Sequence, residues 1–166
     1  MSVQSNRGVW LVVGVLIGLF VGAMAPNAPL HASATHGEDS FAIATGEVEM
    51  GLEAVYFLDM ITGELTGYVM NQNNGKFTTV YKHNVLKDMG ELNKPKFLMV
   101  TGSAGLRQGV GGRIGRSVIY VAEMNSGKFL AYAVPWAPAR AATNLPTAAP
   151  FVLLDGGVFR NAAIRQ

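Results

Sequence analysis

The amino-acid sequence predicts an all-β protein built from two tandem four-stranded antiparallel units. The first observation is a β-hairpin pattern at 53–70, where an apolar aromatic run, a turn ending in Gly63 and a second apolar run follow one another. The second is that this pattern returns at 117–134, with six matching pairs of residues that lie 64 positions apart. The pairs are Tyr56 and Tyr120, Asp59 and Glu123, Met60 and Met124, Thr62 and Ser126, Gly63 and Gly127, and Tyr68 and Tyr132.

Composition limits the classes of protein to consider. The chain has 166 residues, of which 49% are hydrophobic and only 14% are charged, and this balance excludes a disordered chain. It contains no Cys, so a disulfide framework and a thiolate metal site are excluded. The formal net charge of +2 is too small to indicate a nucleic-acid partner.

Residues 1–34 are predicted to be a membrane-targeting segment. Arg7 is the only charged side chain before 8–25, a run of 18 uncharged and mostly apolar residues. This order of charge and apolar run orients the N-terminus inward and exports the remainder of the chain. Two alternatives stay open. In one, 8–25 is an uncleaved anchor in the inner membrane and the protein faces the periplasm; in the other, a leader is cleaved after Ala34 and the protein is secreted.

The rest of the chain is divided into a linker, 35–40, and two β repeats, 41–90 and 91–166. The strands expected in the first repeat are 41–49, 53–59, 64–70 and 76–83. Those expected in the second repeat are 96–106, 117–123, 128–134 and 151–159. The sequence therefore predicts eight strands in two equivalent sets.

Two insertions distinguish the second repeat. The first strands correspond at a spacing of 56, because the stretch from Phe41 to Gly46 matches that from Phe97 to Gly102. The change from 56 to 64 implies eight extra residues, which fall in the glycine-rich basic loop 108–116. The second insertion, 135–150, is rich in Ala and Pro and lengthens the connection to the last strand.

The turn residues are assigned structural roles. Gly63, Gly127 and Gly75 stand where a turn requires a left-handed backbone, which glycine adopts without steric cost. Asp59 and Glu123 precede their turns at equivalent positions, so their side chains are expected to accept hydrogen bonds from the turns rather than to act in catalysis.

The second strand of each repeat is apolar on both faces. Residues 55–58 and 118–121 lack the polar alternation of a sheet that has one wet side. Both strands are therefore predicted to be central and covered on each face. We also expect Tyr56 and Tyr120 to occupy matching environments, and unlike environments would argue against the duplication.

The stretch from Val55 to Leu65, Val-Tyr-Phe-Leu-Asp-Met-Ile-Thr-Gly-Glu-Leu, resembles the inner strands of blades in quinoprotein-like β-propellers. Residues 118–129 fit the same pattern more loosely, and Tyr68 and Tyr132 stand near the place where those blades usually carry a Trp. Propellers have about four to eight blades, so two units cannot close a ring. The resemblance implies either a homo-oligomer that completes the ring, or two sheets folded against each other as an eight-stranded sandwich or barrel.

Charge is divided unequally between the repeats. Residues 41–90 carry a net charge of −3, and residues 97–166 carry +5. One interpretation is that the first repeat of one molecule docks on the second repeat of another. The alternative is that the two repeats attract each other within one chain.

Candidate ligand or interface residues are few. Arg107, Arg113 and Arg116 flank the glycine-rich loop and suit an anion or a lipid headgroup, although a solvated loop is the simpler interpretation. The aromatic candidates for a sugar or interface site, for which core packing is the simpler interpretation, are Tyr68, Tyr132 and Trp136. No catalytic, cofactor or metal residues are predicted, since His83 is the only His of the folded part and no nucleophile elbow exists.

The leading functional hypothesis is a non-catalytic protein of the cell envelope that acts by self-association or by binding another envelope protein. A second hypothesis is a module that binds a glycan or another small ligand, with paired sites in the two repeats. A third is an enzyme of unknown class.

Overall fold

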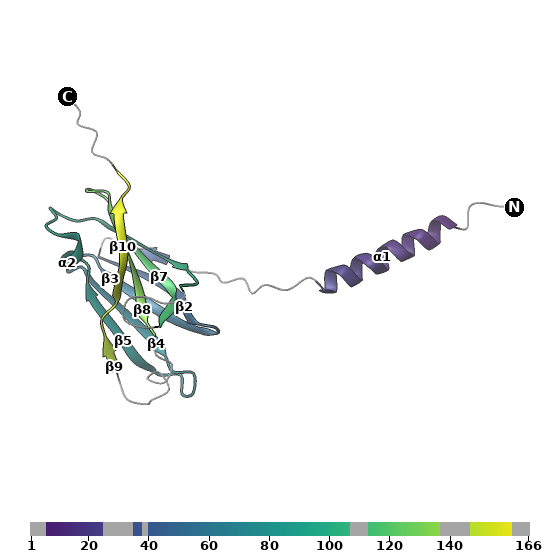
Figure 1. Ribbon diagram of the computed structural model, residues 1–166, viewed down its shortest axis with the longest axis horizontal. Coiled ribbons are helices and arrows are strands. Elements are labelled where there is room, and N and C mark those ends of the chain that lie inside the picture. The colour runs from purple at the N-terminus through teal and green to yellow at the C-terminus, as the bar shows by residue number, and fades with distance from the viewer. Residues whose placement is uncertain (1–5, 25–34, 38–39, 107–112, 137–146, 161–166) are drawn as a thin grey trace, which may run out of the picture. The chain divides into compact units, whose positions relative to one another are not determined.

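The computed structural model describes residues 6–24, 35–37, 40–106, 113–136 and 147–160 (Figure 1). The chain divides into two compact units, 1–32 and 33–166. The first unit contains the helix α1 (Asn6–Met24). No helix in the described part of the chain combines the length and the apolar character that crossing a membrane requires, which differs from the anchor alternative.

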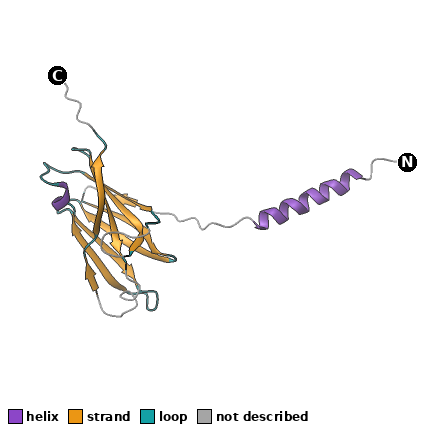
Figure 2. Cartoon of the chain, viewed as in Figure 1, coloured by secondary structure: helices purple, strands orange, loops and turns teal. Residues whose placement is uncertain are grey.

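The second unit consists of two β-sheets (Figure 2). The first sheet contains, in spatial order, β1 (Thr35–Gly37), β2 (Phe41–Glu49), β3 (Leu52–Asp59), β4 (Glu64–Met70), β5 (Phe77–Asn84) and β9 (Thr147–Ala149). The second sheet contains β10 (Val152–Val158), β8 (Lys128–Pro135), β7 (Ile114–Glu123) and β6 (Phe97–Ser103). All pairs are antiparallel except β5 with β9, and the short helix α2 (Leu86–Met89) joins the sheets.

The predicted strands are present, with two additions. β2 to β5 form one antiparallel meander, and β6, β7, β8 and β10 form the other. The mostly β prediction is therefore confirmed, but the first sheet has six strands instead of four, and the described strands lie in two separate sheets and do not form the closed barrel of the alternative. β1 lies in the stretch predicted to be a linker and pairs with β2 through Ala42 to Ala44. β9 lies in the Ala- and Pro-rich insertion and adds a parallel strand to β5.

The two meanders have the same strand register. Tyr56 is paired with Gly67 in the first sheet, and Tyr120 is paired with Ala131 in the second. Every residue pair between β3 and β4 has its counterpart in β7 and β8 at an offset of 64. Phe41 opposite Asp59 likewise corresponds to Phe97 opposite Glu123, which reproduces the offset of 56 for the first strands.

The hairpin turns are also equivalent. The Gly63 N–H donates to the Asp59 carbonyl at 2.8 Å, and the Gly127 N–H donates to the Glu123 carbonyl at 2.9 Å. Both glycines are left-handed, with φ of 70° and 71°. Gly75, which closes the turn between β4 and β5, has φ of 67°. The predicted turn chemistry is therefore present in both sheets.

The two sheets nevertheless bury opposite faces. We call the face that carries Tyr56 or Tyr120 the front, and the face that carries Tyr68 or Tyr132 the back. Tyr56 is 0% exposed and Tyr120 is 38% exposed, so the expectation of matching environments was wrong. This difference in burial counts against the duplication, and the equivalence of the two meanders rests on their shared register and hairpin turns alone. The reason for the difference is that the front of the first sheet packs on the back of the second. Tyr56 therefore points into the interface between the sheets, whereas Tyr120 points away from it.

The core between the sheets contains a few specific polar contacts. The Tyr56 hydroxyl lies 2.5 Å from Ser117 Oγ, and Thr101 Oγ1 donates to the Thr45 carbonyl at 2.5 Å. Burial raises the pKa of Tyr56 far above that of a free tyrosine, so the phenol stays neutral. These contacts connect β3 to β7 and β2 to β6, and they fix how the two sheets are aligned.

Phe151 closes the core where the chain passes from β9 to β10. Its ring centroid lies 6.1 Å from that of Tyr56 and 5.7 Å from that of Tyr81. Gly67 leaves room for the Phe151 ring, because a Cβ added there would lie 2.8 Å from Phe151 Cζ and 3.0 Å from Tyr56 Cδ1. The packing of Phe151 between the sheets therefore requires a glycine at position 67 in β4.

Glu123 is a buried carboxylate, 1% exposed, that organises the β7–β8 turn. Burial raises its pKa, but hydrogen bonds from the backbone N–H groups of Lys96, Ser126 and Asn125 outweigh burial and lower the pKa to about 2. Asp59 occupies the equivalent place and accepts from the N–H groups of Thr62 and Ile61, which lower its pKa. Glu123 also holds the start of β6, because its carboxylate accepts a hydrogen bond from the Lys96 N–H.

We expect Glu123→Gln to destabilise the fold more than Asp59→Asn does at neutral pH. The lowered pKa of Glu123 contributes stability that is fully present above the unfolded pKa of 4.5 and is lost as the pH falls towards about 2. The cost of the substitution at pH 7 should be roughly 2–4 kcal/mol. Urea unfolding at pH 7, 4 and 2.5 measures this, and equal stability of the wild type and Glu123→Gln at pH 7 would contradict it.

Gly67→Ala should destabilise the protein by roughly 1–3 kcal/mol, because the added methyl group overlaps the Phe151 and Tyr56 rings. Gly105→Ala is the matched control, since a Cβ added there meets nothing within 4 Å. Thermal unfolding of both variants tests the packing around Phe151. A Gly67→Ala protein as stable as Gly105→Ala would show that the ring lies elsewhere.

Candidate interaction surfaces

The arginines proposed for anion binding are engaged with acids of the first sheet. Arg113 Nη2 lies 2.7 Å from Glu49 Oε1, and Arg116 Nη1 lies 3.4 Å from Glu47 Oε2. Arg107 lies outside the described residues. Attraction between the repeats of opposite charge therefore occurs within one chain, as the second of the two interpretations predicted.

Trp136 is a core residue rather than an exposed aromatic. It is 3% exposed, and its indole N–H donates to Glu49 Oε2 at 3.0 Å. Glu49 thus accepts from both Trp136 and Arg113, which brings two of the predicted site residues together. Their shared role is to connect the end of β2 to the ends of β7 and β8.

Tyr132 is also buried, at 0% exposed, and lies in a separate polar cluster. Its hydroxyl donates to Asp88 Oδ2 at 2.9 Å, and His83 Nε2 lies 2.6 Å from the same oxygen. Burial and the neighbouring Asp88 raise the pKa of Tyr132. This cluster connects α2 and β5 to the second sheet, and His83 is partly buried and paired with Asp88 in it.

The back face of the first sheet carries an aromatic row. The Tyr68 ring lies edge-on to Phe57 and to Phe77, with centroid separations of 6.1 Å and 5.9 Å. Met70 and Phe77 are 40% and 53% exposed. The further apolar residues of this face, which are half-buried, are Ile43, Val55 and Val80.

A shallow hollow of about 360 Å³ opens at one end of this back face. Its lining residues are Thr45, Gly51, Leu52, Glu53, Ala54, Val55, Met70, Gln72 and Phe77. Glu53 is the single charged residue among them, and the walls are otherwise mostly apolar. The hollow therefore suits an apolar group that carries one hydrogen-bond donor.

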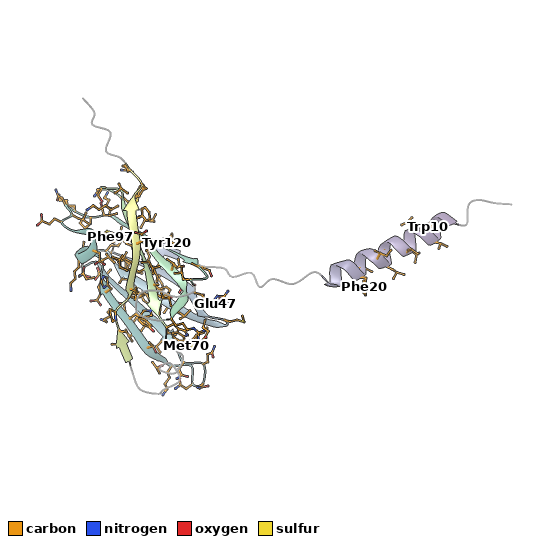
Figure 3. All side chains as sticks on the ribbon, in the orientation of Figure 1. Trp10, Phe20, Glu47, Met70, Phe97 and Tyr120 are labelled. Carbon is orange, nitrogen blue, oxygen red and sulfur yellow. The ribbon has the colours of Figure 1, made fainter. Side chains whose placement is uncertain are left out.

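The front face of the second sheet is the other apolar surface. Leu98, Val100 and Tyr120 are 53%, 44% and 38% exposed. Figure 3 labels one residue of each surface, Met70 on the back of the first sheet and Tyr120 on the front of the second. Burial on this front face is uneven: Val118, on the same face, is only 2% exposed.

Of the proposed aromatic site residues, only Tyr68 belongs to these surfaces. Sequence reasoning did not select Phe57, Phe77, Leu98 or Val100 as site residues. The sequence nevertheless contained the signal for these surfaces, because β3 and β7 are apolar on both faces and were therefore predicted to be covered on both. Within the described residues, the other sheet covers only one face of each meander.

The chemistry of these surfaces is association through apolar burial. Contiguous exposed apolar patches mark binding sites more often than scattered apolar residues do. In the described part of the chain, no group of three His, Asp or Glu side chains lies close enough to hold a metal ion. The surfaces thus offer mainly apolar contact, and their polar groups include Thr45, Glu53, the Tyr68 and Tyr120 hydroxyls and the Glu64–Lys82 ion pair.

Arg113→Ala should lower the stability of the fold by roughly 0.5–1 kcal/mol at low salt, because a partly exposed ion pair is worth little and is screened by salt. Thermal unfolding in 20 mM and 500 mM NaCl measures this loss, which should shrink at high salt. Strong stabilisation of the wild type by phosphate, absent in Arg113→Ala, would instead indicate an anion site.

Comparison with known proteins identifies no family for the chain. No family model, no curated protein and no solved structure matches it. The two apolar surfaces are therefore the features that bear most directly on its function.

Proposed function

We propose that this is a non-catalytic protein that acts by associating with copies of itself or with another protein of the cell envelope. The observation that carries this proposal is the pair of apolar surfaces on opposite sides of the folded unit. Residues 1–34, as a leader, would deliver that unit outside the cytoplasm. The unit then exposes both surfaces where a partner meets them.

The arrangement of the sheets supports a propeller-like mode of assembly. Blades of a propeller repeat around an axis, so the front of each blade faces the back of the next. The two meanders of this chain share their register and are stacked front to back. Such stacking leaves one front and one back uncovered, whereas a two-fold sandwich would bury the same face of both sheets.

Magnitudes indicate that both surfaces take part. Burying the remaining surface of Leu98, Val100 and Tyr120 gains roughly 1 kcal/mol for each side chain. Association costs roughly 4–15 kcal/mol in lost translational and rotational freedom. Three half-exposed residues therefore do not suffice, and the partner must bring an apolar surface of its own.

The back of the first sheet also supports a second candidate function, the binding of a small ligand. The hollow beside Phe77 and Met70 combines apolar walls with the carboxylate of Glu53. A paired site in the second repeat is not formed, because Tyr132 and Trp136 are buried. Such a module would have one site per chain, and a glycan array with the wild type and Phe77→Ala tests it.

Val100→Glu should weaken association at least tenfold, because it places a charge in the middle of the apolar front face. Ile61→Glu is the matched control: Ile61 is 77% exposed but lies in the β3–β4 turn, away from both surfaces. Sedimentation of the full chain over a hundredfold range of concentration gives the mass of each variant. Identical masses for wild type and Val100→Glu at every concentration would contradict self-association through this face.

A further inference from the structure

We propose that the front of the second sheet docks on the back of the first sheet of a second copy, so that the contact inside the chain is repeated between chains. This inference rests on the proposed self-association and adds the identity and orientation of the partner. It is based on the equivalence of the two sheets. Because the front of the first sheet packs on a back face, the equivalent front of the second sheet is expected to pack on a similar back face.

The two fronts have the same chemical character at equivalent positions. In the first sheet, the buried front carries Ala44, Tyr56 and Leu58. The positions that correspond in the second sheet hold Val100, Tyr120 and Ala122. Across β2 to β4 and β6 to β8, the paired front positions hold only glycine, aliphatic and aromatic residues. The exposed front thus repeats the pattern of the front that is already buried.

The two backs correspond in the same way. The buried back of the second sheet carries Met99, Thr101, Ile119 and Tyr132. The equivalent positions on the uncovered back of the first sheet hold Ile43, Thr45, Val55 and Tyr68. Size and polarity are similar at these four positions, whereas Leu130 and Ser103 of the second back correspond to Thr66 and Glu47 of the first. At the centre of the contact, a second copy would therefore meet a surface similar to the one buried in its own core.

The exposed residues lie on the strand that this repetition requires. Inside the chain, β2 lies against β6 and β7. β6 is the equivalent of β2, so in the next contact β6 of one copy would lie against β2 and β3 of the other. Leu98 and Val100, the most exposed residues of this front, both lie on β6.

Equivalence also specifies one polar contact. Tyr56 OH lies 2.5 Å from Ser117 Oγ inside the chain. The residues that correspond are Tyr120 and Glu53, which places the Tyr120 hydroxyl of one copy at the Glu53 carboxylate of the next. Glu53 also lines the hollow on the back face, so the Tyr120 ring would enter a hollow whose single charged residue accepts a hydrogen bond from its hydroxyl.

A front-to-back contact is not self-complementary. Each copy therefore keeps one free front and one free back, and the assembly either closes into a ring or continues as a filament. A ring of about four to eight blades corresponds to about two to four copies.

Single-cysteine variants of the full chain test the orientation, since the natural chain has no Cys. A Cβ built on Gly46 lies 2.8 Å from Ser117 Cβ, and the equivalent residues are Gly102 and Glu53. Disulfides need a Cβ separation of about 3.8 Å, so these positions are close enough to react between copies. Gly102→Cys and Glu53→Cys proteins are oxidised separately and as a mixture, and the dimers are identified by mass spectrometry.

The proposal predicts a mixed Gly102→Cys/Glu53→Cys disulfide in at least tenfold excess over either homodimer. Dominant Gly102→Cys homodimers would show front-to-front docking, and dominant Glu53→Cys homodimers would show back-to-back docking; both overturn this inference but leave self-association intact. A wild type that stays monomeric at all concentrations overturns this inference and the self-association on which it rests, and leaves only association with another protein.

A charge exchange provides a second test that does not need crosslinking. Tyr120→Glu brings its carboxylate to Glu53 of the next copy and should weaken self-association at least tenfold. Mixing Tyr120→Glu with Glu53→Lys should restore association between the two variants, as measured by sedimentation. Absence of restoration, with both variants folded by circular dichroism, contradicts the predicted contact.

Discussion

The front-to-back stacking of two equivalent sheets is the constraint on which the rest of this structure depends. Tyr56 and Ser117 fix the alignment at the centre of the interface, and Thr101 fixes it at β2. Because the stacked faces are different, burial is complete for one front and one back only. The apolar surfaces left over are therefore a consequence of the packing and not an irregularity of the surface.

The interface within the chain is held at its ends by groups that are unique to it. Glu49 accepts from Arg113 and Trp136 at one end, and Asp88 accepts from Tyr132 beside His83 at the other. The equivalent positions of the outer surfaces do not carry this set of charges. A contact between copies should accordingly be weaker than the contact within a copy, which suits a protein that assembles reversibly.

Local structure could be predicted from the sequence, but the choice of buried face could not. Gly63, Gly127 and the offsets of 56 and 64 identify the hairpins and their register, since turn chemistry is local. β3 and β7 are apolar on both faces, so alternation does not indicate which side points inward, and Tyr120 was wrongly placed as a result. β1 was missed because its pairing uses backbone groups of only Thr35 to Gly37. Core packing was the simpler interpretation of Trp136, and this residue is buried.

The central claim is that the front of the second sheet docks on the back of the first sheet of another copy. Isotope-filtered NMR tests this claim most directly. A sample is prepared from equal amounts of methyl-labelled and unlabelled full chains, so that only contacts between molecules are observed. The account predicts intermolecular contacts from the Leu98 and Val100 methyls to Ile43 and Val55. Contacts of Leu98 with Leu98 of the other copy, or intermolecular contacts confined to α1, would contradict it.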